Sequence, residues 1–108
     1  MTLLEQRERD RAGERLRLYD ATRRRLREAL QATAPGHEFW LFGSLRYAGR
    51  FNAASDVDLA FTTLPEGMTE YVLAAELEER LGRPVDLVDL QRTRLRAKIE
   101  REGERWIV

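Results

Sequence analysis

Three aspartates stand in or beside short apolar segments, and they are the residues of this 108-residue chain best suited to metal chemistry. Asp56 and Asp58 lie two positions apart, so in an extended strand their side chains would point to one face, roughly 7 Å apart. Asp86 lies in the apolar segment 85–88, where a buried carboxylate is costly unless it is paired or bound to a metal. Mg²⁺ commonly takes one or two carboxylates plus substrate phosphates. The three aspartates therefore predict a Mg²⁺ site. Taken alone, Asp56 and Asp58 could instead be one turn cap and one solvated side chain, and Asp86 a solvated side chain at a sheet edge.

Gly43 and Ser44 directly follow the apolar segment 38–42, which is a predicted strand. A strand that turns at glycine and enters a helix presents free backbone N–H groups, with the positive end of the helix dipole behind them. Glycine would let a phosphate approach the backbone, and the serine hydroxyl would add a hydrogen bond. A Gly-Ser pair alone is an ordinary turn; beside a group of carboxylates it predicts phosphate binding.

The elements that must position these residues alternate between strands and helices. Segments 38–42, 57–61, 85–88 and 105–108 have the apolar patterns of strands, and segments 3–33, 69–81 and 93–102 read as helices. This order predicts an α/β fold (α+β in some classifications), with helices packed on a small mixed sheet. We expect a single domain over 1–108, composed of a helical segment over 1–34 and a catalytic core over 35–108.

Several details of the helices can also be predicted. The first helix should present one apolar face and could break at Gly13. Thr69 should cap the second helix, which ends at Gly82, and Thr93 should cap the last. Apolar residues predicted to form the buried faces are Ala12, Leu16, Tyr19, Leu26 and Leu30 in the first helix, and Tyr71, Val72, Ala75 and Leu77 in the second.

Composition restricts the class of protein. The sequence has no cysteine, which excludes disulfides and thiolate metal sites, and no apolar run approaches the roughly 20 residues of a membrane helix. The N-terminus is charged too early for a signal peptide, so we expect a cytoplasmic protein with no membrane contact. Basic and acidic residues balance at 19 each, which argues against bulk attraction to nucleic acid.

Taken together, the motifs resemble the nucleotidyltransferase superfamily that includes DNA polymerase β and kanamycin nucleotidyltransferase, and most closely its minimal prokaryotic members. The matching pattern is a strand followed by Gly43-Ser44, then Asp56 and Asp58 on the next strand, then Asp86 on a later one. The resemblance runs from about residue 26 to the C-terminus. After Ser44, many minimal members have Ala-Arg-Gly, whereas this chain reads 45–50 as Leu-Arg-Tyr-Ala-Gly-Arg in a loop about one residue longer.

The resemblance implies a mechanism. Asp56, Asp58 and Asp86 would bind Mg²⁺ against the triphosphate of ATP, and Asp86 would help to deprotonate the attacking hydroxyl. Gly43 and Ser44 would hold the β and γ phosphates, together with an arginine that is either Arg46 or Arg50. Minimal members resemble antitoxins of HEPN-domain ribonuclease toxins, and active ones transfer AMP to a toxin tyrosine. The implied partner is thus a HEPN-domain toxin, in a homo- or hetero-oligomer, and the implied activity is adenylylation of that toxin.

Three alternatives remain open at the level of sequence. The altered loop after Ser44 favours an inactive antitoxin that neutralises its toxin by contact alone. A small-molecule nucleotidyltransferase of the aminoglycoside type would need a second domain or a dimer interface for its acceptor. A nucleic-acid-binding protein is suggested by nine arginines against six acids in residues 1–30, although the interspersed acids favour a solvated helix face.

Overall fold

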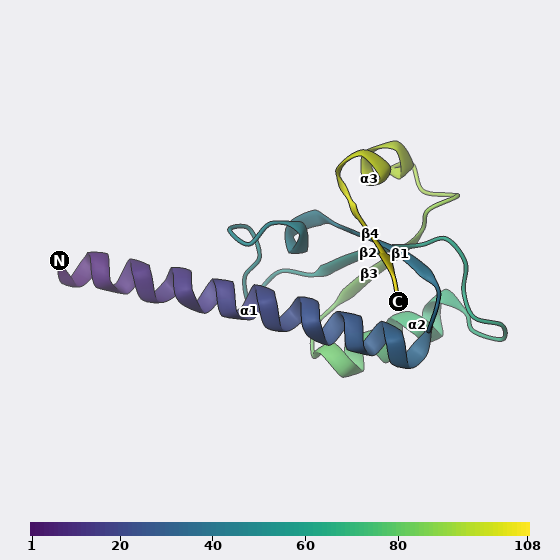
Figure 1. Cartoon of the computed structure of the whole chain (residues 1–108), viewed down its shortest axis with the longest axis horizontal. Helices are drawn as coiled ribbons and strands as arrows, with labels where there is room; N and C mark the ends of the chain where they lie inside the picture. Colours follow the sequence, from purple (N-terminus) through teal and green to yellow (C-terminus); the bar gives the residue numbers. More distant parts are fainter.

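A computed structural model describes all residues 1–108. Three helices, one turn of 3-10 helix and four strands follow one another along the chain (Figure 1). In order they are α1 (Leu3–Thr33), β1 (Glu38–Phe42), the 3-10 turn η1 (Gly43–Arg46), β2 (Val57–Phe61), α2 (Glu70–Leu81), β3 (Val85–Asp89), α3 (Arg96–Glu102) and β4 (Glu104–Ile107).

The four strands form one mixed sheet in the order β3-β2-β1-β4. β1 pairs antiparallel with both β2 and β4, whereas β2 and β3 run parallel. The register places Phe42 opposite Asp58, and Asp58 beside Asp86. The predicted α/β fold, with a small mixed sheet covered by helices, is confirmed.

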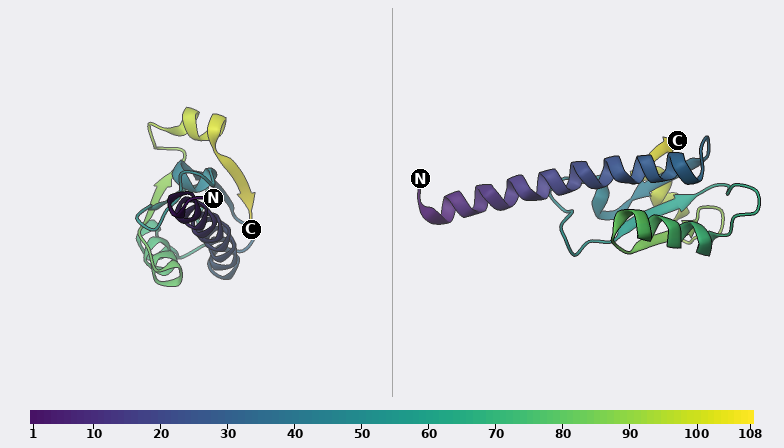
Figure 2. Two further views of the ribbon diagram at one scale, coloured as in Figure 1. Left: turned by 90° about the vertical axis from the view of Figure 1, so that its left-hand side faces the viewer. Right: turned by 90° about the horizontal axis from the view of Figure 1, so that it is seen from below.

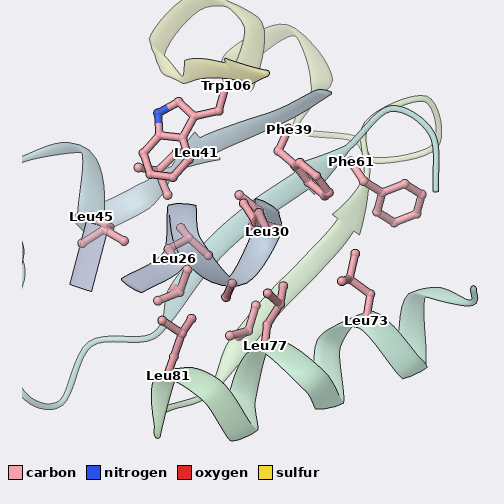
Figure 3. Packing of buried hydrophobic residues seen from close by; sticks show 14 of the residues in the cluster. Leu26, Leu30, Phe39, Leu41, Leu45, Phe61, Leu73, Leu77, Leu81 and Trp106 are labelled. Carbon is pink, nitrogen blue, oxygen red and sulfur yellow. The ribbon is translucent and has the colours of Figure 1, made fainter. Parts of the chain in front are cut away.

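Helices cover both faces of the sheet. α1 and α2 lie on one face, and their buried leucines pack against the strands around Phe39, Leu41 and Trp106 (Figure 3). α3 lies on the opposite face, where Ile99 packs with Ala60 and Leu90. Because side chains alternate along a strand, Asp58 and Asp86 point to the α3 face while their neighbours in β2 and β3 fill the main core.

Only the C-terminal half of α1 packs against the rest of the protein. Leu26 and Leu30 are fully buried, whereas Leu16 is 50% exposed and the first turns extend beyond the sheet (Figures 1 and 2). The prediction of a continuous apolar face was therefore wrong for Ala12 and Leu16, because no strand or other helix covers that part of α1 and only the loop at Ala53 lies near it (Figure 1). The predicted break at Gly13 was also wrong, since α1 is a single helix.

α2 follows its predicted bounds and α3 begins three residues later than predicted, and some predicted details of both helices differ. The Thr69 side chain accepts a hydrogen bond from the Val72 backbone N–H, as expected of an N-cap. The buried face of α2 is formed by Leu73, Leu77 and Leu81, not by the predicted stripe, of which only Leu77 is buried. α3 begins at residue 96, and Thr93 does not cap it; the Thr93 hydroxyl instead accepts from the Leu95 N–H in the preceding turn.

None of the helices, α1 included, has a stretch both long and apolar enough to cross a lipid bilayer.

Candidate functional site

A cavity of about 450 Å³ lies on the α3 face of the sheet, where β1 ends and β2 and β3 begin. It contains six of the seven residues that the sequence singled out. Its lining is formed by Phe42, Gly43, Ser44, Arg46, Tyr47, Arg50, Asp58, Asp86, Leu95, Lys98, Ile99 and Glu102. Residues far apart in the sequence thus meet in one cavity.

Gly43 forms the sharp turn at the end of β1, with a φ of +72° that favours glycine. A Cβ atom at this position would overlap the Asp58 carboxylate. Glycine is thus required both for the backbone conformation and for the close approach of an acidic side chain. The turn leads into η1, which is a single 3-10 turn and not an α-helix. Backbone N–H groups, more than a helix dipole, are therefore available to an anion.

Asp58 and Asp86 lie side by side on parallel strands, which are separated by about 4.8 Å in any sheet. Partial burial and the negative charges of Asp86 and then Asp56 raise the pKa of Asp58 to about 6. The Asp58 carboxylate accepts no hydrogen bond and forms no ion pair with any side chain of the protein. Asp86 lies on the edge strand and is exposed, and its carboxylate likewise has no hydrogen-bond or ion-pair partner in the protein.

Asp56 lies just before β2 and does not line the cavity. It is close enough to influence two charged groups, because its charge raises the pKa of Asp58 and also partly offsets the burial that lowers the pKa of Arg83. Arg83 in turn donates to the Ser55 carbonyl at 2.8 Å and stacks over Phe51, which fixes the segment that leads to Asp56.

The donor chemistry of this region suits a magnesium ion that arrives with its substrate. No group of three or more Asp, Glu or His side chains could by itself bind a metal ion in this structure. Mg²⁺ does not need such a group, because it usually retains water and completes its shell with phosphate oxygens around one or two carboxylates. Asp58 and Asp86, both lining the cavity, can supply such a pair.

Arg46 is occupied by contacts with the C-terminal segment. Its Nε donates to the Glu102 carbonyl at 3.0 Å and its Nη1 lies 3.5 Å from the Glu104 carboxylate. The same carboxylate accepts from Arg23 at 2.8 and 2.5 Å and from Trp106 Nε1 at 2.7 Å. Burial would raise the pKa of Glu104, but these hydrogen bonds and the two arginine charges outweigh it, so the pKa lies below its usual value.

This network also fixes the backbone of η1. Arg23 donates to the Leu45 carbonyl at 3.1 Å, and the Tyr19 hydroxyl lies 3.4 Å from the Arg46 carbonyl. The turn that follows Gly43 is therefore attached both to α1 and to β4.

Two cations in the cavity have no acidic partner. Arg50 stacks over the Tyr47 ring, with its guanidinium carbon 4.8 Å from the ring centroid, and forms no ion pair. The side-chain ammonium group of Lys98, on α3, forms neither an ion pair nor a hydrogen bond. Of the two arginines that the sequence left open, Arg50 is the one free to meet an anion.

Sequence analysis missed Lys98 and the network around Glu104. Lys98 could have been noticed as the only lysine of the chain. No pattern in the sequence indicated Glu104, because its three donors come from positions 23, 46 and 106.

Comparison with known proteins gives two matches. The sequence profile of the family described as "Polymerase beta, Nucleotidyltransferase" matches residues 25–107. A solved structure described as "Crystal structure of the toxin-antitoxin with AMP-PNP" contains a chain that is similar to this one, with a TM-score of 0.59 and 25% identity over 79% of this chain and 73% of that one. No curated protein matches the sequence.

Proposed function

The chain belongs to the polymerase β nucleotidyltransferase family, and we propose that it is an antitoxin that transfers AMP from ATP to its partner toxin with the help of Mg²⁺. One observation supports this more than any other. The paired carboxylates of Asp58 and Asp86 share a cavity with the glycine turn at Gly43, and they have no partner in the protein. Such an arrangement is suited to a cation and a phosphate together.

Residues around the cavity would have distinct roles. Asp58 and Asp86 would bind Mg²⁺, with Asp56 joining them once substrate is present. The ion would neutralise the triphosphate and polarise the phosphorus under attack. The backbone of Gly43 and the hydroxyl of Ser44 would hold phosphate oxygens, and Arg50 would add a positive charge.

The reaction would be an in-line displacement at the α phosphorus. The acceptor hydroxyl oxygen forms a bond to that phosphorus, the bond to the β-phosphate oxygen breaks, and pyrophosphate leaves. Asp86 is the residue proposed to accept the proton of the hydroxyl. It is more exposed than Asp58, so an incoming acceptor can reach it. The remaining residues would act by positioning and by neutralising charge.

The nature of donor and partner is proposed from the structural neighbour. That neighbour is described as a toxin–antitoxin with AMP-PNP, an ATP analogue, which supports ATP as donor and a toxin as partner here. We further propose, from the resemblance to minimal nucleotidyltransferases, that the toxin has a HEPN domain and that a tyrosine hydroxyl is the acceptor. The protein would then act in the cytoplasm, in a complex with that toxin.

One observation favours a second candidate function, an antitoxin that acts by contact alone. Arg46, the first arginine after the Gly-Ser turn, is directed to Glu102 and Glu104 rather than left free. If Arg50 does not replace it, nucleotide binding could survive without transfer.

Transfer of ³²P from α-labelled ATP to a co-expressed toxin would distinguish these two functions. We expect Mg²⁺-dependent labelling of the toxin, with the rate of label transfer reduced at least a hundredfold in Asp58→Asn and in Asp86→Asn. Asp89→Asn is a matched control, because Asp89 is also on β3 but lies outside the cavity and pairs with Arg92. If the wild-type protein neutralises the toxin with no label transferred, the contact-only function is correct.

A further inference from the structure

Lys98 is the only lysine of a chain that otherwise uses arginine for every basic side chain, and it lines the cavity. The two arginines of α3 itself form ion pairs: Arg96 with Glu100 at 2.6 Å, and Arg101 with Glu102 at 3.9 Å. Lys98 forms none, although Glu102 lies one helical turn away and also lines the cavity. The one unpaired cation of this helix is therefore the one that faces the site.

The charges around the cavity restrict where a phosphate chain could lie. Asp58 and Asp86 repel every phosphate oxygen that is not bound to a cation. The guanidinium of Arg46 is engaged by the Glu102 carbonyl and by the Glu104 carboxylate, which it shares with Arg23. The cations of the cavity that have no acidic partner, and so are free to attract phosphates, are Arg50, from the loop after η1, and Lys98, from α3.

We infer that Lys98 binds the β and γ phosphates of the donor nucleotide, together with Arg50, and so stabilises the pyrophosphate that leaves. This inference rests on the proposed function and names a ligand group for it. A lysine suits the task because its compact ammonium group has three donors that can follow a phosphate as it moves away. As the bond between the α phosphorus and the β-phosphate oxygen breaks, negative charge grows on that oxygen, and a cation next to it lowers the barrier.

Calorimetry with the full-length protein and Mg²⁺ tests the inference by comparing ATP, pyrophosphate and AMP. A charge-assisted hydrogen bond at a solvent-accessible site corresponds to about a tenfold change in affinity. In Lys98→Ala we expect ATP and pyrophosphate to bind about tenfold more weakly, with AMP affinity unchanged. Arg94→Ala removes one positive charge from the turn before α3 without touching the cavity, and should bind all three ligands as the wild type does.

The outcomes separate the two proposals. If Lys98→Ala binds ATP and pyrophosphate as tightly as the wild type, or loses AMP affinity to the same extent, the assignment of Lys98 to the distal phosphates is wrong and the proposed function stands. If the wild-type protein itself binds no ATP, the proposed function fails first.

The single lysine permits a second, independent measurement. Pyridoxal 5′-phosphate combines a phosphate with an aldehyde that forms an imine with a nearby amine, and borohydride reduction makes the adduct permanent. We expect one side-chain adduct, at Lys98, which ATP and pyrophosphate prevent and AMP does not. Labelling that none of the three ligands reduces would contradict the inference.

Discussion

Asp58 and Glu104 are partly buried acids on the two strands that flank β1, yet their surroundings are opposite. Glu104, on the α1 face, accepts hydrogen bonds from Arg23, Arg46 and Trp106, and its pKa is lowered. Asp58, on the α3 face, accepts none and lies among other acids, so its pKa is raised to about 6.

The difference separates stabilisation from function. A carboxylate with several donors stabilises the fold around it, whereas one surrounded by like charges destabilises the empty protein and favours any cation that binds. Both acids affect the same turn, since Glu104 fixes the far end of η1 through Arg46 and Arg23, and Asp58 packs against its first residue, Gly43.

The largest effect should come from Gly43→Ala. The new methyl group would overlap the Asp58 carboxylate, and alanine also disfavours the φ of +72°. Strain and overpacking together should cost about 3 kcal/mol of unfolding free energy. Nucleotide binding should also be lost. Urea unfolding measures the change in unfolding free energy, and calorimetry measures the nucleotide affinity.

Gly36→Ala is the matched control for that change. Gly36 has a similar φ of +79°, but a Cβ there would meet no atom within 4 Å. It should lose only the backbone contribution, about 1 kcal/mol, and keep full nucleotide affinity. Equal losses in the two variants would mean that the contact between Gly43 and Asp58 has no energetic weight.

Glu104→Gln should have the second largest effect. The amide retains the shape of the side chain but removes the charge that Arg23 and Arg46 face. We expect the unfolding free energy to fall by about 2 kcal/mol, because the guanidinium of Arg23 is left partly buried without a counter-charge. Nucleotide affinity should fall with it, since η1 loses one attachment. Glu100→Gln, which breaks an exposed pair on α3, should change stability by less than about 0.5 kcal/mol.

The contrast between these two acids also explains what the sequence could predict. Gly43, Asp58 and Asp86 were predictable because each directly follows a strand with a clear apolar pattern or lies near the start of one. Local pattern could not reveal Glu104, whose partners depend on how α1 packs on the sheet. The same limit explains the error at Leu16, whose helical spacing is regular but which is 50% exposed on a part of α1 that no strand or second helix covers (Figure 1). In α2 the face that packs consists of three leucines four residues apart, whereas Tyr71, predicted to be on the buried face, is 80% exposed.

Asp58→Asn should have the opposite sign to Glu104→Gln. Removing the charge relieves repulsion from Asp86 and Asp56 and the cost of partial burial. Solvent screening reduces the gain to about 1 kcal/mol for the metal-free protein at pH 8. Thermal unfolding tests this, and Mg²⁺ added together with ATP should raise the melting temperature of the wild type but not of the variant. A destabilised variant would contradict the contrast between the two acids.

The smallest effect is a pH dependence that distinguishes the two acids in the wild type. The pKa of Asp58 is about 6 in the folded protein and 3.8 in the unfolded chain, so the folded state binds more protons between those values. Stability should therefore fall as pH rises from about 4 to 6 and then level off, with a total change of about 1 kcal/mol after screening by solvent. Glu104 acts the other way: its lowered pKa gives stability that is present above about 4.5 and lost as pH falls through the folded value. Urea unfolding of wild type and Asp58→Asn across pH 3–8 should show two curves that coincide near pH 4 and separate by pH 6. A gap between the curves that is the same at every pH would mean that the stabilisation by asparagine comes from packing, and not from the charge of Asp58.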